Sequence, residues 1–167
     1  MTKPSVYLDT NIVSALVYDG RDSAAIARTL ATWEWWEHER QFFNVYTSSF
    51  AEGELEQGKF RGQTAALKIV HRITYLPGTA TVRDIAKHFL EHGIVPLSQP
   101  GDANHLAFAC AHGIDYLLSW NHSHLANDVT QRKLEIANEQ LGLRTPLLRS
   151  PLTIPRATLG QVIRREV

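Results

Sequence analysis

The sequence predicts an α/β protein with a central, mainly parallel sheet that helices cover on both faces. Short apolar runs typical of buried strands alternate along the chain with longer segments whose apolar residues recur every three or four positions, as in amphipathic helices. Parallel neighbours need a crossover connection, which is usually a helix. The alternation of the two kinds of segment therefore favours a parallel sheet between helical layers.

The first half of the chain is expected to begin with a buried strand. Each helix is predicted from its apolar spacing, and each strand from a short apolar or β-branched run. Serine or threonine before a helix and glycine after it mark several boundaries, because a hydroxyl caps the first turn and glycine ends the last. In order, the expected segments are a strand at Val6–Leu8, helical residues from just after Thr10, a helix at about Ser23–Arg40, a strand at Phe42–Thr47, a helix from Ser48 or Ser49 to near Gly58, a helix at Gln63–Ile73 and a helix at Thr79–His92.

The second half is expected to complete the sheet. The segments are a loop rich in helix breakers at Pro96–Gly101, a helix that Asp102 opens and Gly113 closes, a strand at Tyr116–Trp120, a helix at Asp128–Leu141 and, after Pro146, a short strand and a short helix at about Ala157–Arg164. A chain of 167 residues suits one sizeable core. We expect a single domain over residues 1–167, with a core at about 5–127 and a C-terminal extension of helix and strand at about 128–167.

Composition narrows the class of protein. Seventeen basic and 17 acidic residues give a formal charge of zero, so the chain has no global positive field and any nucleic-acid contact must come from a local site. The single cysteine, Cys110, cannot form an intramolecular disulfide and lies in an apolar run. No apolar segment approaches the roughly 20 residues that span a bilayer, and the N-terminus reaches Asp9 too soon for a signal peptide. We expect a cytoplasmic protein without membrane contact.

Polar clusters follow the predicted strands. Asp9, Thr10 and Asn11 come directly after the first strand, and Glu52 and Glu54 lie on the helix after the second. Asn121, His122 and His124 follow the strand at Tyr116–Trp120, and Asp102 opens the helix before that strand. In an open parallel sheet the active crevice lies beyond the carboxyl ends of the strands. We therefore expect these groups to converge there.

Converging carboxylates favour a divalent cation. Without one, neighbouring carboxylates repel and raise one another's pKa. Mg²⁺ and Mn²⁺ take oxygen ligands through a few carboxylates plus water, which leaves room for a substrate phosphate. Such a cation activates water and stabilises charge on a phosphodiester.

Each residue also has a purely structural interpretation. Asp9 and Asp102 each suit the start of a helix, where a carboxylate caps the first turn. Glu54 suits a solvated helix face, and Asn121 an ordinary turn. His105, one helical turn after Asp102, suits either a contact to substrate or cation-held water or a hydrogen-bonded helix histidine.

The stretches "YLDTNIV", "TSSFAEGELEQG" and "GDANHLAFACAHGIDYLLSWNHSHLAN", in this order, together resemble the PIN-domain family and, within it, the VapC-type toxin ribonucleases and close relatives. The resemblance covers roughly Val6 to Asn127. Its strongest part is Asp-x-x-His-Leu-Ala-x-Ala from Asp102, followed by Gly-x-Asp-Tyr-Leu-Leu-Ser-Trp-Asn. The Glu-Leu motif of the second cluster is its weakest part.

The resemblance implies a three-layer α/β/α fold and an endoribonuclease that hydrolyses RNA phosphodiesters with Mg²⁺- or Mn²⁺-activated water. Carried over by motif, the metal-binding acids are Asp9, Glu54 and Asp102, with Glu52 as the alternative to Glu54. Thr10, Asn11 and His105 support them. The resemblance further implies the toxin of a toxin–antitoxin pair, with an antitoxin partner that covers the acidic site, and a homodimer.

The sequence departs from the family pattern after the last strand of this motif. Many family members carry a fourth acid there, whereas this chain has Asn121, which we expect to orient cation-held water or substrate. The alternative function is therefore a PIN-fold module that binds RNA or protein with little or no catalysis. A metal-dependent phosphohydrolase for small molecules would use the same acids, but the chain lacks an Asp-x-Asp pair at Asp9.

Overall fold

Five parallel strands form the sheet at the centre of the computed structural model, which describes residues 2–161. In chain order the strands are β1 (Ser5–Leu8), β2 (Asn44–Ser48), β3 (Thr74–Leu76), β4 (Tyr116–Leu118) and β5 (Leu147–Arg149). Their order in the sheet is β3-β2-β1-β4-β5, and every neighbouring pair is parallel. The expected parallel sheet is confirmed, and β1 lies at its centre between β2 and β4.

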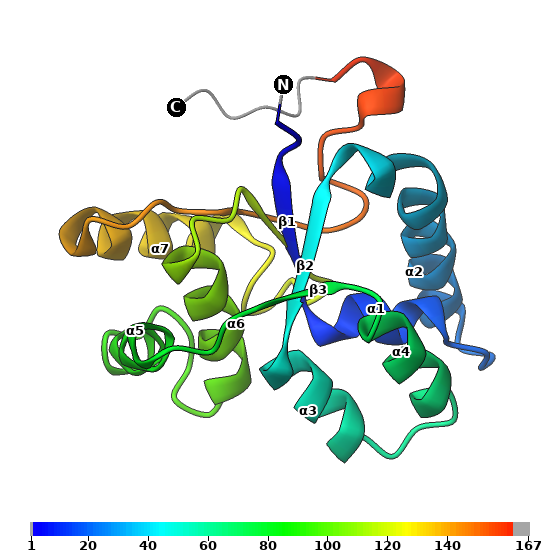
Figure 1. Ribbon diagram of the computed structural model, residues 1–167, viewed down its shortest axis with the longest axis horizontal. Helices are drawn as coiled ribbons and strands as arrows, with labels where there is room; N and C mark the ends of the chain where they lie inside the picture. Colours follow the sequence, from blue (N-terminus) through cyan, green and yellow to red (C-terminus); the bar gives the residue numbers. More distant parts are fainter. Residues whose placement is uncertain (1, 162–167) are drawn as a thin grey trace.

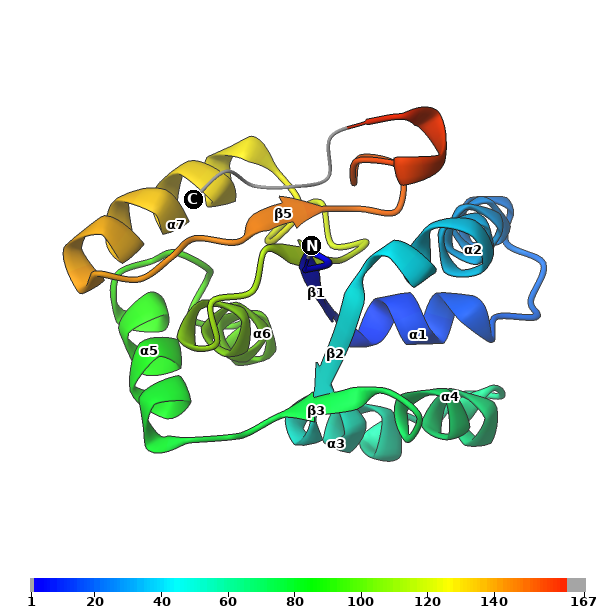
Figure 2. The same ribbon diagram turned by 45° about the horizontal axis from the view of Figure 1, so that its top comes forward.

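Helices cover both faces of this sheet. They are α1 (Thr10–Leu16), α2 (Ser23–Glu34), α3 (Ser49–Gln57), α4 (Gln63–Val70), α5 (Ala80–Glu91), α6 (Pro100–Ala111) and α7 (Asp128–Leu141). Helices α5, α6 and α7 lie on one side of the sheet, and α1 and α2 lie on the other, with α3 and α4 beside α1 (Figures 1 and 2). This is the three-layer α/β/α arrangement that the sequence predicts.

Alternation along β1 divides the core between the two faces. Tyr7 faces the cluster that α5, α6 and α7 complete. Val6 and Leu8 point the opposite way and pack in the cluster that contains Trp35 and Trp120. Because all three β1 side chains are fully buried, the strand is apolar on both faces, as expected for the centre of a parallel sheet.

The helix expected at Ser23–Arg40 changes its geometry before it ends. The α-helix α2 stops at Glu34 and continues as a π-helix, η1 (Trp35–Glu39), and a 3₁₀ turn, η2 (Arg40–Phe42). This wider turn places both Trp35 and Glu39 in the interior. The Glu39 carboxylate accepts hydrogen bonds from the backbone N–H groups of Ala157 (2.7 Å) and Thr158 (3.3 Å), so it anchors the C-terminal segment.

Two other boundaries were predicted wrongly. The helix expected at Gln63–Ile73 ends at Val70. The strand β3 follows it, where no strand was predicted. An edge strand of three residues is too short to show a clear apolar pattern in the sequence. Helix α6 begins at Pro100 instead of Asp102, with proline in the first turn, where its missing N–H costs nothing.

The C-terminal elements follow the prediction more closely. Helix α7 has the expected bounds, and β5 follows Pro146. The short helix expected at about Ala157–Arg164 is a 3₁₀ turn, η3 (Ala157–Leu159), and residues 162–164 of that prediction lie outside the described residues. Among the helices described, none is long and apolar enough to cross a membrane.

Candidate metal centre

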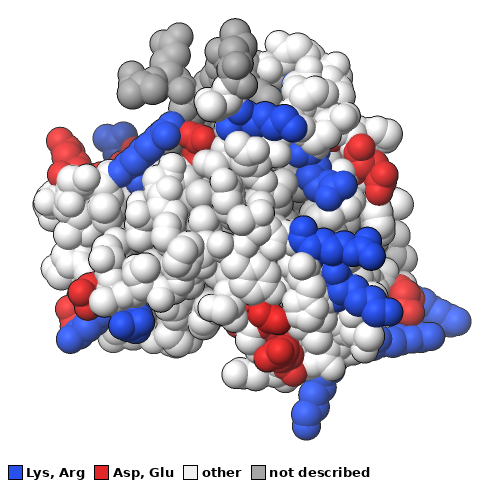
Figure 3. Space-filling view, viewed as in Figure 1, with Lys and Arg blue, Asp and Glu red and all other residues white. Residues whose placement is uncertain are grey.

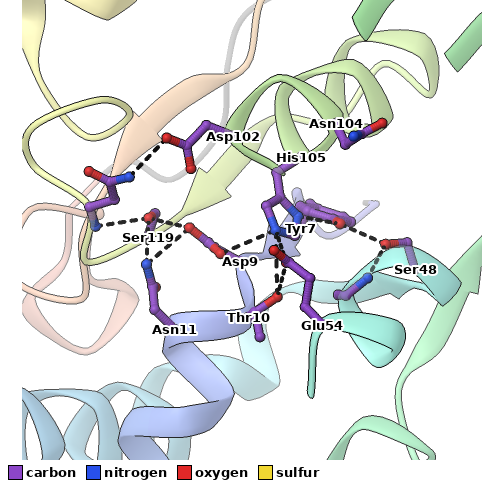
Figure 4. A network of polar contacts seen from close by, with 12 residues as sticks. Tyr7, Asp9, Thr10, Asn11, Ser48, Glu54, Asp102, Asn104, His105 and Ser119 are labelled. Carbon is purple, nitrogen blue, oxygen red and sulfur yellow. Dashed lines mark hydrogen bonds and ion pairs between the residues drawn. The ribbon is translucent and has the colours of Figure 1, made fainter. Parts of the chain in front are cut away.

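The three predicted acids lie beyond the carboxyl ends of neighbouring strands. Asp9 follows β1 directly, Glu54 lies on α3 after β2, and Asp102 lies in the first turn of α6. Asn121 follows β4, which pairs with β1. Figure 4 shows the side chains of Asp9, Glu54 and Asp102 around a common space between α1, α3 and α6.

Asp9 is held by its side-chain contacts to the end of β4. Its Oδ2 accepts hydrogen bonds from the Ser119 hydroxyl at 2.6 Å and from the Asn11 side-chain amide at 3.0 Å. Within residues 2–161 the carboxylate makes no capping bond to α1, although Asp9 occupies the N-cap position. Capping therefore does not explain this buried carboxylate.

His105 lies between the first two acids. Its Nε2 is 2.6 Å from Glu54 Oε1 and 3.4 Å from Asp9 Oδ1. The Thr10 hydroxyl also donates to Glu54 Oε1, at 2.6 Å. One ligand atom each of Asp9, Glu54 and His105 lie within 4.8 Å of one another, so the three side chains form a compact donor cluster.

Asp102 is directed by the segment after β4. Its Oδ2 accepts a hydrogen bond from the Asn121 side-chain amide at 3.2 Å and lies 3.3 Å from His124 Nδ1. Asn121 Oδ1 in turn accepts from the backbone N–H of His124 at 2.9 Å. Asn121 therefore fixes the loop against Asp102, and Asp102 itself lies beside the compact cluster.

The structure separates the two candidate glutamates of α3. Glu52 points to another side of the helix and pairs with the exposed His71, whose Nε2 lies 2.6 Å from Glu52 Oε1. Glu54 faces Asp9 and His105. Side chains two residues apart on a helix point to different sides of it, which explains why only Glu54 reaches the cluster.

Burial and charge act together on the ionisable groups. Burial raises the pKa of Asp102, and the charge of Asp9 raises it further. Burial would raise the pKa of Glu54, but the hydrogen bond and charge of His105 and the Thr10 hydroxyl hold it below its usual value. Burial alone would lower the pKa of His105, but Asp9 and Glu54 outweigh it and the pKa is raised. The two carboxylates thus favour the protonated form of the imidazole.

Three side chains of the centre were not predicted from the sequence, namely Tyr7, Ser48 and Ser119. Ser119 holds Asp9, whereas His124, one of the polar residues expected after β4, contacts Asp102. Tyr7 and Ser48 hold the far side of His105, with the Tyr7 hydroxyl 2.8 Å from His105 Nδ1 and 2.7 Å from Ser48 Oγ. The one sequence signal that points to Tyr7 and Ser119 is a hydroxyl group within an otherwise apolar predicted strand.

The comparison with family models decides the family. The PIN domain model matches residues 6–127, which is most of the chain. The chain belongs to the PIN domain family. The matched range contains every predicted site residue, from Asp9 to Asn121, and ends just before α7.

Solved structures resemble this PIN protein at low identity. VapBC2 from Rickettsia felis, solved bound to a DNA fragment from their promoter, is 15% identical with a TM-score of 0.48, covering 87% of this chain and 97% of that one. FitAcB from Neisseria gonorrhoeae is 14% identical with a TM-score of 0.43, covering 71% and 89%. No curated protein matches the chain.

The donor set of this PIN protein fits the hard divalent cation that the family implies. Within the described residues, no lysine or arginine forms an ion pair with Asp9, Glu54 or Asp102, so their charge is offset only by histidines. Carboxylate oxygens are the ligands that Mg²⁺ and Mn²⁺ prefer. Gly101 also leaves room beside the cluster, because a Cβ there would lie 3.1 Å from Glu54 Oε2.

Proposed function

We propose that this PIN protein is a Mg²⁺- or Mn²⁺-dependent endoribonuclease. The observation that supports it is the convergence of Asp9 and Glu54, with His105 between them and Asp102 alongside, beyond the ends of β1, β2 and β4. Asp9 is buried and Glu54 and Asp102 are partly buried, and such carboxylates without a lysine or arginine partner are costly unless a cation compensates their charge. The phosphate oxygens of a phosphodiester are suitable ligands for the open coordination positions of such a cation.

The chain's own residues would prepare the acidic centre for this reaction. When bound, the cation lowers the pKa of a water molecule and stabilises the charge that develops on the phosphate. Ser119 and Asn11 occupy Oδ2 of Asp9, which leaves Oδ1 facing the cluster. Thr10 fixes the Glu54 carboxylate, and Asn121 fixes Asp102. These hydrogen bonds hold the carboxylates in place before substrate arrives, which reduces the reorganisation needed for catalysis.

The charge distribution supports an RNA substrate despite the zero formal charge. Figure 3 shows lysine and arginine side chains along the α2 and α4 side of this face, and acidic side chains over α3. Exposed basic residues on or next to these helices include Arg28 on α2, Arg61 before α4, which pairs with Asp19, and Arg72 after α4. A local basic flank beside an acidic centre attracts phosphates without a net positive charge on the whole molecule.

Cleavage of a mixed panel of structured RNAs tests this proposal. The purified wild type should cleave with Mn²⁺ and should stop on addition of a chelator. Asp9→Asn and Glu54→Gln should each lose cleavage, because each removes a carboxylate from the cluster. Glu52→Gln is the matched control on the same helix: its partner is His71, so cleavage should persist. Wild-type cleavage by the folded Asp9→Asn and Asp102→Asn proteins would contradict the proposal.

One observation favours the second candidate, an RNA- or protein-binding module with little catalysis. The position of the fourth family acid holds Asn121, whose amide bonds Asp102 instead of adding a negative charge. The binding module replaces the nuclease if the folded wild type binds RNA without added metal but cleaves none of the panel. In that case the Asp9→Asn protein should bind RNA with the same affinity as the wild type.

The toxin role, the antitoxin partner and the homodimer are proposed on the sequence resemblance. Induced expression in bacteria should arrest growth, and Asp9→Asn should relieve the arrest because it removes a proposed metal ligand. Light scattering of the purified protein gives the oligomeric state, and a mass of one chain would overturn the dimer. Growth unaffected by the wild type, at matched protein levels, would remove the toxin role and leave the nuclease.

A further inference from the structure

His105 lies inside the acidic centre. Its side chain is 2% exposed, and Nε2 is the atom that faces both Glu54 Oε1 and Asp9 Oδ1. Figure 4 shows the ring entering from α6 between the two carboxylates. A ring nitrogen in this place either substitutes for a cation or binds one.

The opposite edge of the ring is fixed. Nδ1 is 2.8 Å from the hydroxyl of Tyr7, which is fully buried on β1, and that hydroxyl is 2.7 Å from Ser48 Oγ. Phe50 packs edge-on against the imidazole, with ring centroids 5.2 Å apart. Histidines that bind metals generally have their second nitrogen held by such a partner, which sets the ring orientation and tautomer. The surroundings of His105 match that arrangement.

The spacing of the donor atoms also fits a shared cation. Adjacent ligands in an octahedral shell at about 2.1 Å lie about 3.0 Å apart. The distance from Nε2 to Asp9 Oδ1 is 3.4 Å, close to this value. The distance to Glu54 Oε1 is 2.6 Å, a hydrogen-bond distance that would open slightly around a cation.

We propose that His105 Nε2 is a direct ligand of the cation, beside Asp9 and Glu54, and that this centre therefore prefers Mn²⁺ to Mg²⁺. The inference rests on the metal centre of the proposed function and adds a nitrogen donor to it. Imidazole suits first-row transition metals, whereas Mg²⁺ takes oxygen ligands almost exclusively. In the liganded state the ring carries its proton on Nδ1 and donates it to the Tyr7 hydroxyl, which donates to Ser48 Oγ.

Pulsed electron paramagnetic resonance tests the bond directly. Protein with ¹⁵N-labelled histidine is loaded with Mn²⁺ in the absence of RNA, and hyperfine coupling to a directly bound ¹⁵N is measured. The wild type should show the coupling. It should vanish in His105→Gln, which keeps a hydrogen-bonding side chain in place, and should persist in the control His38→Gln, whose histidine is exposed on η1.

Calorimetry with Mn²⁺ and Mg²⁺ measures the preference. His105→Gln should lower the Mn²⁺ affinity about tenfold or more, with a smaller loss for Mg²⁺. Tyr7→Phe removes the Nδ1 partner without changing the ring volume and should lower the Mn²⁺ affinity in the same direction. Tyr75→Phe on β3, whose phenol lies beside Glu52, is the matched control and should leave the affinity unchanged.

The outcomes separate this inference from the proposed function. Mn²⁺ bound to the wild type without nitrogen coupling overturns the nitrogen ligand, while metal-dependent RNA cleavage by the same sample would keep the nuclease. Coupling that survives in His105→Gln and disappears in His124→Gln overturns it as well, because it assigns the nitrogen to the neighbour of Asp102. A wild type that binds no Mn²⁺ and cleaves no RNA overturns both.

Discussion

Asp9 shows how one side chain acquires its orientation from a distant part of the chain. The residue sits where a helix cap is expected, yet its carboxylate is held by Ser119 from the end of β4, 110 positions away in sequence. Ser119 Oγ also accepts hydrogen bonds from the Asn11 side-chain amide at 3.1 Å and from the backbone N–H of Asn121 at 3.0 Å. One buried hydroxyl therefore joins the residues after β1 to those after β4.

Ser119→Ala should weaken both cation binding and the fold. The change removes the donor to Asp9 Oδ2, and loss of a group that orients a ligand typically lowers metal affinity by about 10–100-fold. Unfolding by urea should show a loss of about 1–3 kcal/mol, since two donors lose their acceptor. Mn²⁺ titration of the variant beside Ser14→Ala, a serine on α1 outside these contacts, measures the difference. Equal affinities of the two variants would show that Asp9 needs no support from β4.

A second buried hydroxyl links the site to α2. The indole N–H of Trp120 donates to Thr32 Oγ1 at 2.8 Å, and both side chains are buried. Thr32→Val should cost about 1–3 kcal/mol of unfolding free energy, because it leaves the indole N–H without an acceptor. Thr29→Val, one turn earlier, is the matched control: among the described residues the Thr29 hydroxyl has no hydrogen-bond partner, so its loss should leave stability unchanged or raise it. Similar losses in both variants would contradict this account.

At the scale of elements, the first turn of α6 lies beside Glu54 of α3 and limits the room around its carboxylate. Gly101 lies in the first turn of α6, and a Cβ at this position would come within 3.1 Å of Glu54 Oε2. The Glu54 carboxylate is held at its other oxygen by Thr10 and His105, so it has little freedom to move away. The absence of a side chain at Gly101 therefore keeps the carboxylate in the cluster.

Gly101→Ala should displace Glu54 and lower Mn²⁺ affinity about tenfold, as loss of ligand orientation does elsewhere. The matched control is Gly53→Ala on α3, where a Cβ meets nothing within 4 Å in the described chain. That control should keep the affinity and raise helix stability by up to about 1 kcal/mol, because alanine is the better helix former. Calorimetric titration of both proteins provides the measurement, and unchanged affinity in Gly101→Ala would show that the carboxylate tolerates the contact.

The elements also show what could be predicted from the sequence. The strand at Val6–Leu8 and α7 were predicted within a residue or two, because apolar run and helical spacing were both clear. The strand β3 was missed because it has only three residues and because Ile73 continues the apolar spacing of the preceding helix. The change from α2 to the π-helix η1 was missed because it depends on burying Glu39 against backbone N–H groups about 118 positions away, which no local pattern reports.

For the site, the motifs predicted that Asp9 and Glu54 lie together, but not which other side chains they contact. Asp9 and Glu54 meet in one cluster, and His105, predicted as a supporting residue, lies between them. Asp102 and Asn121 pair with each other beside it. The roles of Tyr7, Ser48 and Ser119 follow from strand register, in which Tyr7 pairs with Tyr46 and Leu117. Spacing within one segment carries no information about such register, so these partners could not be predicted from it.

At the scale of the whole molecule, the acidic centre joins elements from both sides of the sheet. Asp9 leads into α1 on one side, whereas His105 and Asp102 come from α6 on the other, and Glu54 comes from α3 at the β3 end (Figures 1 and 4). A cation held by these residues would therefore stabilise the assembled fold and not one helix. Any ligand that binds only the folded state adds to the free energy of unfolding by mass action.

Mn²⁺ should therefore raise the thermal midpoint of the wild type. A concentration of about 100 times the dissociation constant adds about 2.7 kcal/mol, which for a chain of this size corresponds to a shift of roughly 5–11 °C at about 2–4 °C per kcal/mol. Calorimetric scans with and without Mn²⁺ measure it. Asp9→Asn should show little or no shift, because it loses the carboxylate that Ser119 and Asn11 orient. Glu52→Gln should shift like the wild type, since Glu52 pairs with His71 on the surface. A shift of the same size in Asp9→Asn would place the stabilising cation somewhere other than this centre.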